Sequence, residues 1–431
     1  MSTMRVQPVK RLHGEIQVQG DKSVSHRAII LGSIAKGVTT VTNFLPSDDC
    51  MATMNAFRAM GTSIEDINES TVKIEGKNLY GLTEPADVMD MGNSGTSARL
   101  LCGLLAGQQF FSVMTGDSSL RRRPMKRVAG PLRNMGANIL GRRDGDLLPL
   151  AIKGGELQGI HHRLPVASAQ VKSALLLAGL YARGKTAVEE IPQSRDHTER
   201  MLRYFGINLE KDGNVLTIES GQKLIASDVH VPGDISSAAF FMVGASIVNS
   251  SEVVVRDVGL NRTRTGIIDV LKQMGANIEI IDLRDVSGEP VGDVRIKYAP
   301  LKGTVISGSI IPRLVDELPV ICIAAAVAEG ETLIKDAAEL RVKESDRIAV
   351  MAECLSSMGV DVETFDDGMR ITGKKKLKGT VCHSHGDHRI AMSMAIAGLV
   401  AEGEMVIEDT ECIKTSFPRF EEMLRGLCVD E

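Results

Sequence analysis

The sequence predicts an α/β protein of two domains, built from six copies of one structural repeat, with buried helices inside and sheets outside. Three observations predict it. One series of helices ends repeatedly at a glycine, a second series of alanine-rich helices alternates with the first, and a motif of the first half returns in the second. The 431 residues, 43% hydrophobic and 24% charged, suffice for two sizeable cores.

The first series of helices ends at glycines that are evenly spread along the chain. They lie in FRAMGTSIE, LRNMGANIL, LRYFGINLE, LKQMGANIEI and LSSMGVDVE, with successive spacings of 75, 70, 69 and 84 residues, at Gly61, Gly136, Gly206, Gly275 and Gly359. Glycine suits the left-handed position just beyond a helix, and a short alternating strand follows each one. Each repeat is therefore predicted to consist of a strand, a helix, a strand, a helix and a hairpin, and the hairpin after Gly275 is unusually long.

The second series consists of apolar helices that run into strands. They occur in SIAKGVTTVTNF, GLLAGQQFFSVM, LYARGKTAVEEI, GASIVNSSEVVVRD, AAVAEGETLIKD and GLVAEGEMVIED. Because few charges lie around their circumference, we expect them to be buried on all sides, whereas the first series is amphipathic.

A motif that occurs once in each half of the chain groups the six repeats into two sets of three. VQGDKS at 18–23 returns as VPGDIS at 231–236. We therefore place one domain at 21–233 and the other at 234–431, closed by a strand from residues 1–20. The cleft between two domains is the natural place for a ligand, so we expect the active site there.

Composition excludes several classes of function. A formal net charge of −5, 3% aromatic residues and no Trp argue against a nucleic-acid binder. The seven cysteines form no CxxC pair, so neither a disulfide framework nor a thiolate zinc site is indicated. The first residues, MSTMRVQPVKRLHGEI, form no apolar signal core, and no uninterrupted apolar stretch reaches membrane-spanning length, so we expect neither a signal peptide nor a membrane span. We expect a cytoplasmic protein with small-molecule partners and neither nucleic acid nor membrane.

Six apolar helices begin with polar clusters. In GDKSVSHR (20–27), Lys22, Ser23 and Arg27 stand at a helix N-terminus, whose unpaired N–H groups and positive dipole end favour an anion. Ordinary capping is the alternative, and we prefer it for PGDISS. For the set as a whole we favour convergence of these helix starts on one cleft. The other starts are MGNSGTSAR (91–99), VASAQVKSA (166–174), VPGDISSAA (231–239), PRLVDELPV (312–320) and HGDHRIAMS (385–393).

Three further charged stretches are ambiguous when taken singly. SLRRRPMKR (119–127) reads as a solvated face or a nucleic-acid patch, although Pro124 keeps Arg123 in a loop before a helix. In LRVKESDR (340–347), Glu344 and Arg347 read as a surface ion pair. HSHGDHR (383–389) has histidines at metal-like spacing but no completing ligand set, so we expect no metal there. His388 and its neighbour Arg389 are read instead as ligand donors.

Taken together, the motifs resemble those of the 5-enolpyruvylshikimate-3-phosphate synthase family, in order and with fitting gaps over residues 17–418. They are GDKSVSHR, GNSGTSARL, RRRPM, ASAQVKSA, LVDELP, LRVKESDR, GDHRIAM and IKTSFP. The resemblance implies a two-domain inside-out α/β barrel. It also implies transfer of the enolpyruvyl group of phosphoenolpyruvate to the 5-hydroxyl of shikimate 3-phosphate, with release of phosphate, on the route to chorismate and aromatic amino acids. We expect no metal or organic cofactor, and a monomer.

The resemblance assigns roles residue by residue. Where the family often has a tyrosine, this chain has Ser194 and Arg195, and where it often has an asparagine, this chain has Glu339. The shikimate 3-phosphate contacts are then Lys22, Ser23, Arg27, Ser168, Ala169 (through its backbone), Gln170, Arg195, Asp316 and Lys343. The phosphoenolpyruvate contacts are Lys22, Gly95, Arg123, Gln170, Arg347, Arg389 and Lys414, to which the reading of HSHGDHR adds His388.

The chemistry explains these residue types. Both substrates carry a phosphate and a carboxylate, so the site needs a surplus of Arg and Lys. We expect Asp316 to accept the hydroxyl proton and Glu344 to protonate the methylene carbon, giving a tetrahedral ketal that loses phosphate. Lys22 would stabilise charge or carry a proton.

Two other functions are open at this point. A UDP-N-acetylglucosamine enolpyruvyl transferase shares the sixfold fold, but it carries a reactive cysteine before its Arg-Pro pair, where this chain reads GDSSLRRRP. A non-catalytic phosphometabolite-binding protein would gain little from Asp316 and Glu344, because carboxylates repel anionic ligands.

Overall fold

The structure, a computed structural model, describes residues 2–191 and 193–429 and divides into two compact units. The first unit comprises Gly20–Val231 and Val286–Glu289, and the second comprises Met1–Gln19, Pro232–Asp285 and Pro290–Glu431. Each unit has its own cluster of buried apolar side chains. Within the described residues, no helix combines the length and apolarity that a membrane span requires.

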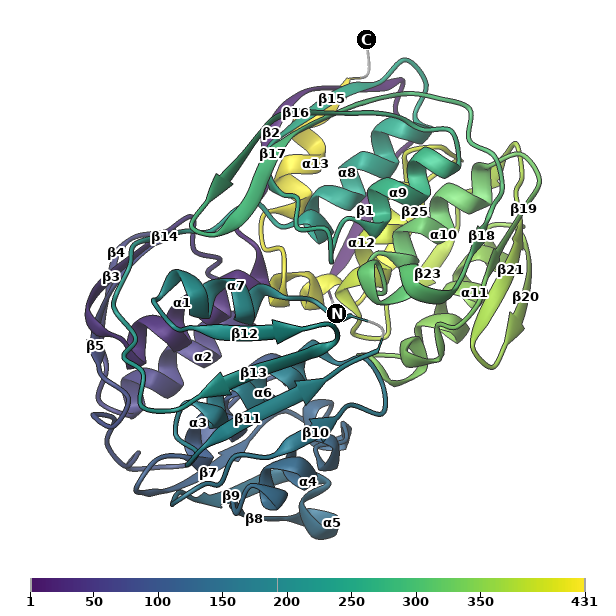
Figure 1. The fold of residues 1–431 in the computed structure, drawn as a ribbon. Helices are drawn as coiled ribbons and strands as arrows, with labels where there is room; N and C mark the ends of the chain where they lie inside the picture. Colours follow the sequence, from purple (N-terminus) through teal and green to yellow (C-terminus); the bar gives the residue numbers. More distant parts are fainter. Residues whose placement is uncertain (1, 192, 430–431) are drawn as a thin grey trace. The chain divides into compact units, whose positions relative to one another are not determined.

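The first unit repeats one sheet pattern (Figure 1). A short strand pairs in parallel with a longer strand, which pairs antiparallel with a hairpin, in the orders β14-β3-β5-β4, β6-β7-β9-β8 and β10-β11-β13-β12. The strands are β3 Lys36–Thr42, β4 Ser63–Asn68, β5 Thr71–Lys77, β6 Met89–Asp90, β7 Phe111–Thr115, β8 Asn138–Gly141, β9 Leu147–Lys153, β10 His161–Arg163, β11 Lys185–Glu189, β12 Leu209–Asp212, β13 Val215–Glu219 and β14 Val229–His230.

The helices of the first unit are of two kinds. α1 Lys22–Ile34, α3 Gly95–Ala106 and α6 Ala169–Gly179 are buried over most of their residues. The amphipathic helices bury one face, because polar residues occupy the other. They are α2 Asp48–Ala59, α4 Lys126–Asn134 and α7 His197–Tyr204, and the shorter elements are η1 Leu120–Arg122 and the turn α5 Arg142–Gly145.

The backbones of α3 and α6 are in direct contact at Gly103. A Cβ atom on Gly103 would lie 1.9 Å from the carbonyl oxygen of Ala174 and 2.8 Å from its Cα. Only glycine permits this approach, so the two helices are held at a fixed short distance.

The second unit repeats the sheet pattern with strands from both ends of the chain. The order is β18-β19-β21-β20 in one sheet and β16-β17-β15-β2-β26 in another. In a third, β1 pairs with β25, which are purple and yellow in Figure 1. The strands are β1 Thr3–Val6, β2 Arg11–Gln17, β15 Glu252–Gly259, β16 Asn277–Val286, β17 Glu289–Lys297, β18 Val305–Ile306, β19 Glu331–Ile334, β20 Asp361–Phe365, β21 Gly368–Thr372, β22 Leu377–Lys378, β23 Val381–His383, β24 Ala401–Glu402, β25 Met405–Glu408 and β26 Cys428–Val429.

The apolar helices of the second unit are buried in the same way. They are α8 Ile235–Ile247, α10 Leu318–Val327 and α12 His388–Gly398. The remaining helical elements are α9 Gly266–Gln273, α11 Arg347–Ser357, α13 Phe420–Leu427, η2 Gly308–Arg313, η3 Ala338–Val342 and η4 Thr410–Thr415.

The structure confirms the predicted fold class and the predicted helix ends. The glycines expected to end the first series have φ values between 83° and 99°, at Gly61, Gly136, Gly206, Gly275 and Gly359. Arg123 is extended, with φ −78° and ψ 138°, as the following proline predicts. The expected long hairpin is formed by β16 and β17, and its tip, Val286–Glu289, belongs to the first unit.

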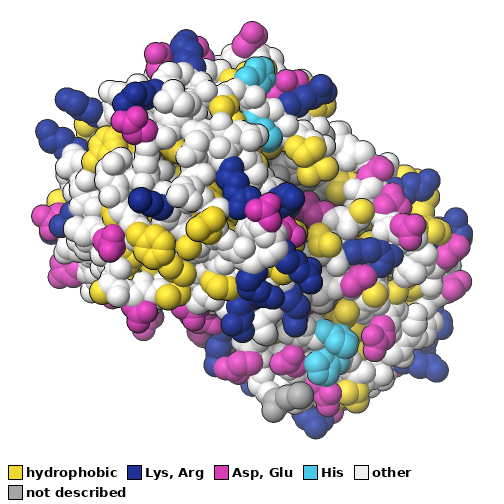
Figure 2. Space-filling view, turned by 90° about the horizontal axis from the view of Figure 1, so that it is seen from below, with side chains coloured by type: hydrophobic (Ala, Val, Ile, Leu, Met, Phe, Trp, Pro, Cys, Tyr) yellow, Lys and Arg dark blue, Asp and Glu magenta, His cyan; other side chains and the backbone are white. Residues whose placement is uncertain are grey.

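Charge is unevenly distributed over the surface. On the face drawn in Figure 2, Lys and Arg side chains gather in a few groups, with Asp and Glu side chains beside and between them. The overall excess of acid therefore coexists with local groups of basic side chains.

Candidate active site

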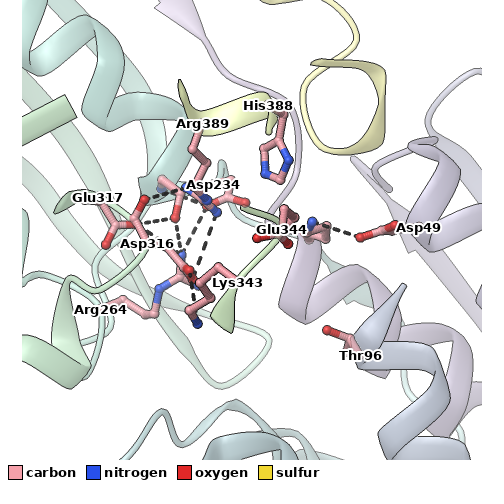
Figure 3. Close-up of polar contacts among 12 residues, drawn as sticks. Asp49, Thr96, Asp234, Arg264, Asp316, Glu317, Lys343, Glu344, His388 and Arg389 are labelled. Atoms are coloured by element: carbon pink, nitrogen blue, oxygen red, sulfur yellow. Dashed lines mark hydrogen bonds and ion pairs between the residues drawn. The ribbon is translucent and has the colours of Figure 1, made fainter. Parts of the chain in front are cut away.

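The N-terminus of α1 positions Lys22 in the first unit. Asp21 ends the preceding loop, and its carboxylate accepts a hydrogen bond of 2.9 Å from the Val24 N–H, which begins the helix. The partly buried Lys22 ammonium lies 3.0 Å from the Asp49 carboxylate of α2, drawn in Figure 3. The Lys22 ammonium is therefore held in place at the N-terminus of α1.

Arg27 lies one turn further along α1 and is buried. Its guanidinium donates to Thr198 Oγ1 at 2.6 Å, to Ser173 Oγ at 2.9 Å and to the Ser23 carbonyl at 2.9 Å. Burial lowers the pKa of Arg27 to about 10, and the nearby charge of Arg195 acts in the same direction. Arg27 is still a cation at neutral pH, and its neighbours fix its orientation.

The N-terminus of α3 lies beside two guanidinium groups. A Cβ atom on Gly95 would lie 2.7 Å from Arg99 Nη1 and 3.6 Å from Arg123 Nη1. Arg123 is held by Asn93, whose Oδ1 accepts from its Nη2 at 2.6 Å. Gly95 therefore leaves room next to groups that can bind an anion.

Gln170 joins the starts of α6 and α3. Its Oε1 accepts from Arg99 Nη1 at 2.8 Å, and its Nε2 donates to Thr96 Oγ1 at 3.1 Å. Ser168 caps α6, and the Ala169 carbonyl accepts from the Ser173 hydroxyl. These hydrogen bonds place the predicted residues of α6 near those of α3.

Asp316 is surrounded by cations in the second unit (Figure 3). Its carboxylate oxygens lie 3.8 Å from Lys343 Nζ, 3.6 Å from Arg347 Nη1 and 4.0 Å from Arg389 Nη2. Arg389 also donates to the Asp316 carbonyl at 3.1 Å. The structure thus brings together the predicted residues Asp316, Lys343, Arg347 and Arg389.

Arg347 connects Asp316 with the second predicted catalytic carboxylate. Its side chain is 1% exposed, and its Nη2 donates to Glu344 Oε2 at 2.7 Å. Its Nε donates to Asp387 Oδ2 at 2.8 Å. The Glu344–Arg347 pair exists as the local spacing predicts, but the expectation of a surface pair is wrong, because Arg347 is buried and paired with several carboxylates.

Asp387 is a residue that the sequence analysis missed. It caps α12 by accepting from the Arg389 N–H at 2.9 Å, and it accepts from Ser345 Oγ at 3.0 Å. Burial alone would raise the pKa of Asp387, but the Arg347 charge lowers it below the ordinary value of 3.8. The available signal was an acid directly before a predicted helix, which reads as a cap and does not reveal the buried arginine.

We expect Asp387→Asn to destabilise the second unit by about 3–5 kcal/mol at pH 7, because it leaves the buried Arg347 without its strongest partner. Since the folded pKa lies below the ordinary 3.8, the wild-type stabilisation is fully present above that pH and is lost as the pH falls through the folded pKa. The free energy of unfolding in urea, measured at pH 7 and at pH 3, checks this. Asp269→Asn is the control, because Asp269 also pairs with an arginine but its side chain is 49% exposed. An equal difference at both pH values would contradict the assignment.

A second buried network lies beside Asp316, around Arg264. Arg264 Nη2 donates to Ser236 Oγ at 2.6 Å and lies 3.4 Å from Asp234 and 3.8 Å from Glu317 (Figure 3). Asp234 also caps α8 through the Ser236 N–H at 2.8 Å, so the capping interpretation of PGDISS is confirmed. Because Glu317 follows Asp316 directly, this network fixes the segment that carries Asp316.

His388 and Lys414 are less closely tied to this cluster. His388 is 3% exposed, with Nδ1 3.3 Å from Thr415 Oγ1. Lys414 has a side chain that is 61% exposed and paired with Glu411 at 2.5 Å. Glu339 pairs with Lys343 at 3.3 Å. Over residues 2–191 and 193–429, no group of three or more His, Cys, Asp and Glu side chains has a metal-binding arrangement.

Comparisons with known proteins agree with the resemblance seen in the motifs. Residues 6–424 match the model of a family described as EPSP synthase (3-phosphoshikimate 1-carboxyvinyltransferase). The 3-phosphoshikimate 1-carboxyvinyltransferase of Citrifermentans bemidjiense is 57% identical over 427 residues, 99% of each chain, and that of Geotalea uraniireducens is 57% identical over 429 residues, 100% of each chain. A solved EPSP synthase structure from Acinetobacter baumannii is similar with a TM-score of 0.90 and 50% identity, covering 99% of this chain and 98% of that one.

Proposed function

Because the chain belongs to the EPSP synthase family, we propose that the charged groups of both units act on one pair of substrates, phosphoenolpyruvate and shikimate 3-phosphate. The reaction is transfer of the enolpyruvyl group of phosphoenolpyruvate to the 5-hydroxyl of shikimate 3-phosphate, with release of phosphate. The observation that carries the catalytic assignment is the contact of one buried guanidinium, Arg347, with both carboxylates, Glu344 and Asp316. That both units act at one shared site stays a prediction.

The first unit supplies the binding groups for the phosphate and ring of shikimate 3-phosphate in this proposal. Arg27 and Arg195 attract the phosphate, and the hydroxyls of Ser23 and Ser168 donate to it. Ala169 offers its backbone, and Gln170 its amide. From the second unit, Asp316 and Lys343 bind the end of the ring that carries the reacting hydroxyl.

Asp316 and Glu344 divide the proton transfers. Asp316 accepts the proton of the 5-hydroxyl as the oxygen bonds to the central carbon of phosphoenolpyruvate. Glu344 donates a proton to the methylene carbon, which becomes the methyl group of a tetrahedral ketal. The ketal then loses phosphate, and a methyl proton returns to the Glu344 carboxylate, which restores the double bond. Lys22 stabilises the negative charge that moves onto the leaving phosphate.

The remaining cations bind phosphoenolpyruvate. Arg123, beside Gly95, and Lys22 lie in the first unit, where Gln170 also contributes. Arg347, His388, Arg389 and Lys414 lie in the second unit. Arginine forks match phosphate and carboxylate groups in two-point hydrogen bonds, which orients the substrate as well as binding it.

We expect Gly95→Ala to raise the KM for phosphoenolpyruvate by about tenfold and to change the KM for shikimate 3-phosphate much less. The added methyl would meet Arg99 Nη1 at 2.7 Å and reduce the space beside Arg123. Steady-state kinetics with each substrate varied in turn measures the effect. Gly130→Ala is the matched control, because nothing lies within 4 Å of its added Cβ; equal KM values for Gly95→Ala and the wild type would contradict the role of Gly95.

Phosphate release tests the proposal as a whole. We expect phosphate from phosphoenolpyruvate with shikimate 3-phosphate, and none when UDP-N-acetylglucosamine replaces the acceptor or when the acceptor is omitted. Release with the nucleotide sugar would favour the sister transferase, and binding without release would favour a non-catalytic protein. We also propose a cytoplasmic monomer, which cell fractionation and sedimentation would test.

A further inference from the structure

Lys172 is a buried cation for which the motif comparison gives no role. It belongs to ASAQVKSA, two residues after Gln170, and it is 0% exposed. Its Nζ lies 2.6 Å from Glu190 Oε1 and 2.6 Å from Glu199 Oε1. Buried ion pairs are often no more stabilising than apolar side chains of the same volume, so stability alone does not account for this triad.

Glu190 connects Lys172 to the segment before Arg195. Its second oxygen, Oε2, accepts from the Ser194 N–H at 3.1 Å and from Ser194 Oγ at 2.6 Å. One buried carboxylate thus holds both α6 and the residue that directly precedes Arg195. The position of the Arg195 backbone therefore depends on this carboxylate.

Glu199 connects Lys172 to the groups that hold Arg27. It lies on α7, directly after Thr198, whose Oγ1 accepts from Arg27 Nε at 2.6 Å. Thr198 Oγ1 also lies 2.6 Å from the hydroxyl of Ser173, the residue that follows Lys172. The pairing of Lys172 with Glu199 thus fixes α7 against α6 next to Arg27.

The charges around Arg27 also indicate that the carboxylates of this network support the binding groups. Burial lowers the pKa of Arg27, and the negative charge of Glu199 opposes that effect. Two guanidinium groups, Arg27 and Arg195, are close enough to repel each other, and a neighbouring carboxylate makes their closeness less costly.

We propose that Lys172, acting through Glu190 and Glu199, is a positioning residue that sets the geometry of the shikimate 3-phosphate binding groups. It connects the start of α6, the Arg195 segment and the hydroxyls around Arg27 through one buried centre. The inference rests on the proposed function, because it takes Arg27, Arg195 and Ser168 to bind this substrate.

Glu190→Gln tests the inference with little change in volume. An amide has one acceptor oxygen in place of two, so it cannot serve both Lys172 and the Ser194 N–H. We expect the KM for shikimate 3-phosphate to rise about tenfold, and the KM for phosphoenolpyruvate and kcat to change less than about twofold. An equal rise of both KM values, or no rise, would overturn the proposal.

A double-variant cycle separates positioning of Arg195 from a general structural effect. We expect Arg195→Ala alone to raise the KM for shikimate 3-phosphate, and Glu190→Gln to add less than about twofold in that background. Full additivity would overturn the proposal. Glu199→Gln should likewise raise the KM for shikimate 3-phosphate. Its effect should be small in an Arg27→Ala background, because Glu199 acts through the groups around Arg27.

Two controls make the outcome interpretable. Ala178→Gly, on the same buried helix but away from the triad, should lower the thermal midpoint without changing either KM. Arg27→Ala and Arg195→Ala test the proposed roles themselves: if neither raises the KM for shikimate 3-phosphate, those roles fail and the positioning proposal fails with them. If both raise it and Glu190→Gln does not, only the positioning proposal fails.

Discussion

Glu344→Gln should lower kcat by about 10³-fold, because the amide cannot deliver a proton to the methylene carbon of phosphoenolpyruvate. Its oxygen can still accept from Arg347 Nη2, which lies 2.7 Å from Glu344 Oε2, so binding and folding should change little. The expected signature is a lower kcat at nearly unchanged KM values. In D₂O, we expect reversible ketal formation to incorporate deuterium into the methylene group with the wild type, and we expect the variant to lose this incorporation.

The matched control for this prediction lies nearby in the chain. Glu344 precedes α11 by three residues, whereas Glu353 is on α11 and its side chain is 71% exposed. Glu353→Gln changes the same functional group and should retain full kcat. A Glu344→Gln enzyme with more than about one tenth of the wild-type kcat would rule out Glu344 as the proton donor.

Asp316→Ala is expected to reduce kcat by about 10²–10⁴-fold, since the acceptor hydroxyl loses its base. The substitution also removes the carboxylate that faces Lys343, Arg347 and Arg389 at 3.6–4.0 Å. We therefore expect a change in the KM for shikimate 3-phosphate as well. Phosphate release at saturating substrates measures the loss, and circular dichroism shows whether the variant is folded.

Rescue by a small carboxylate separates the base from the other functions of Asp316. Formate fits the volume left by the removed side chain and should restore part of kcat to Asp316→Ala, but none to Glu344→Gln. Asp361→Asn, at an exposed position of β20, should behave as wild type. Unchanged turnover by Asp316→Ala, or rescue of both variants alike, would contradict the assignment.

The fold was predictable because its signals are local. Each glycine that ends a helix of the first series acts within its own turn, and the same is true of Pro124 and Arg123. The absence of charge around α8 is likewise a property of a short segment, and it predicts the burial that the structure shows for every residue of that helix. Repetition then made each local interpretation more secure than it would be alone.

The partners of the site residues were not predictable in this way. Arg27 and Thr198 are 171 positions apart, and Arg347 and Asp387 are 40 apart. The motifs place Arg347 at a helix start, but nothing within a few residues shows that it is buried. The spacing of residues along the chain predicts which side chains lie on the same helical turn. Burial and long-range pairing depend instead on how separate elements of the fold pack against one another.

The contact at Gly103 has a consequence for how this chain can vary. Residue 103 lies two turns from Gly95 along α3, and it touches the backbone of α6, whose own start carries Ser168 and Gln170. A side chain there would displace both segments that we propose to bind ligand. If they do, we expect Gly103→Ala to weaken substrate affinity although the residue meets no substrate, so that tolerance to mutation would not simply increase with distance from the reacting groups.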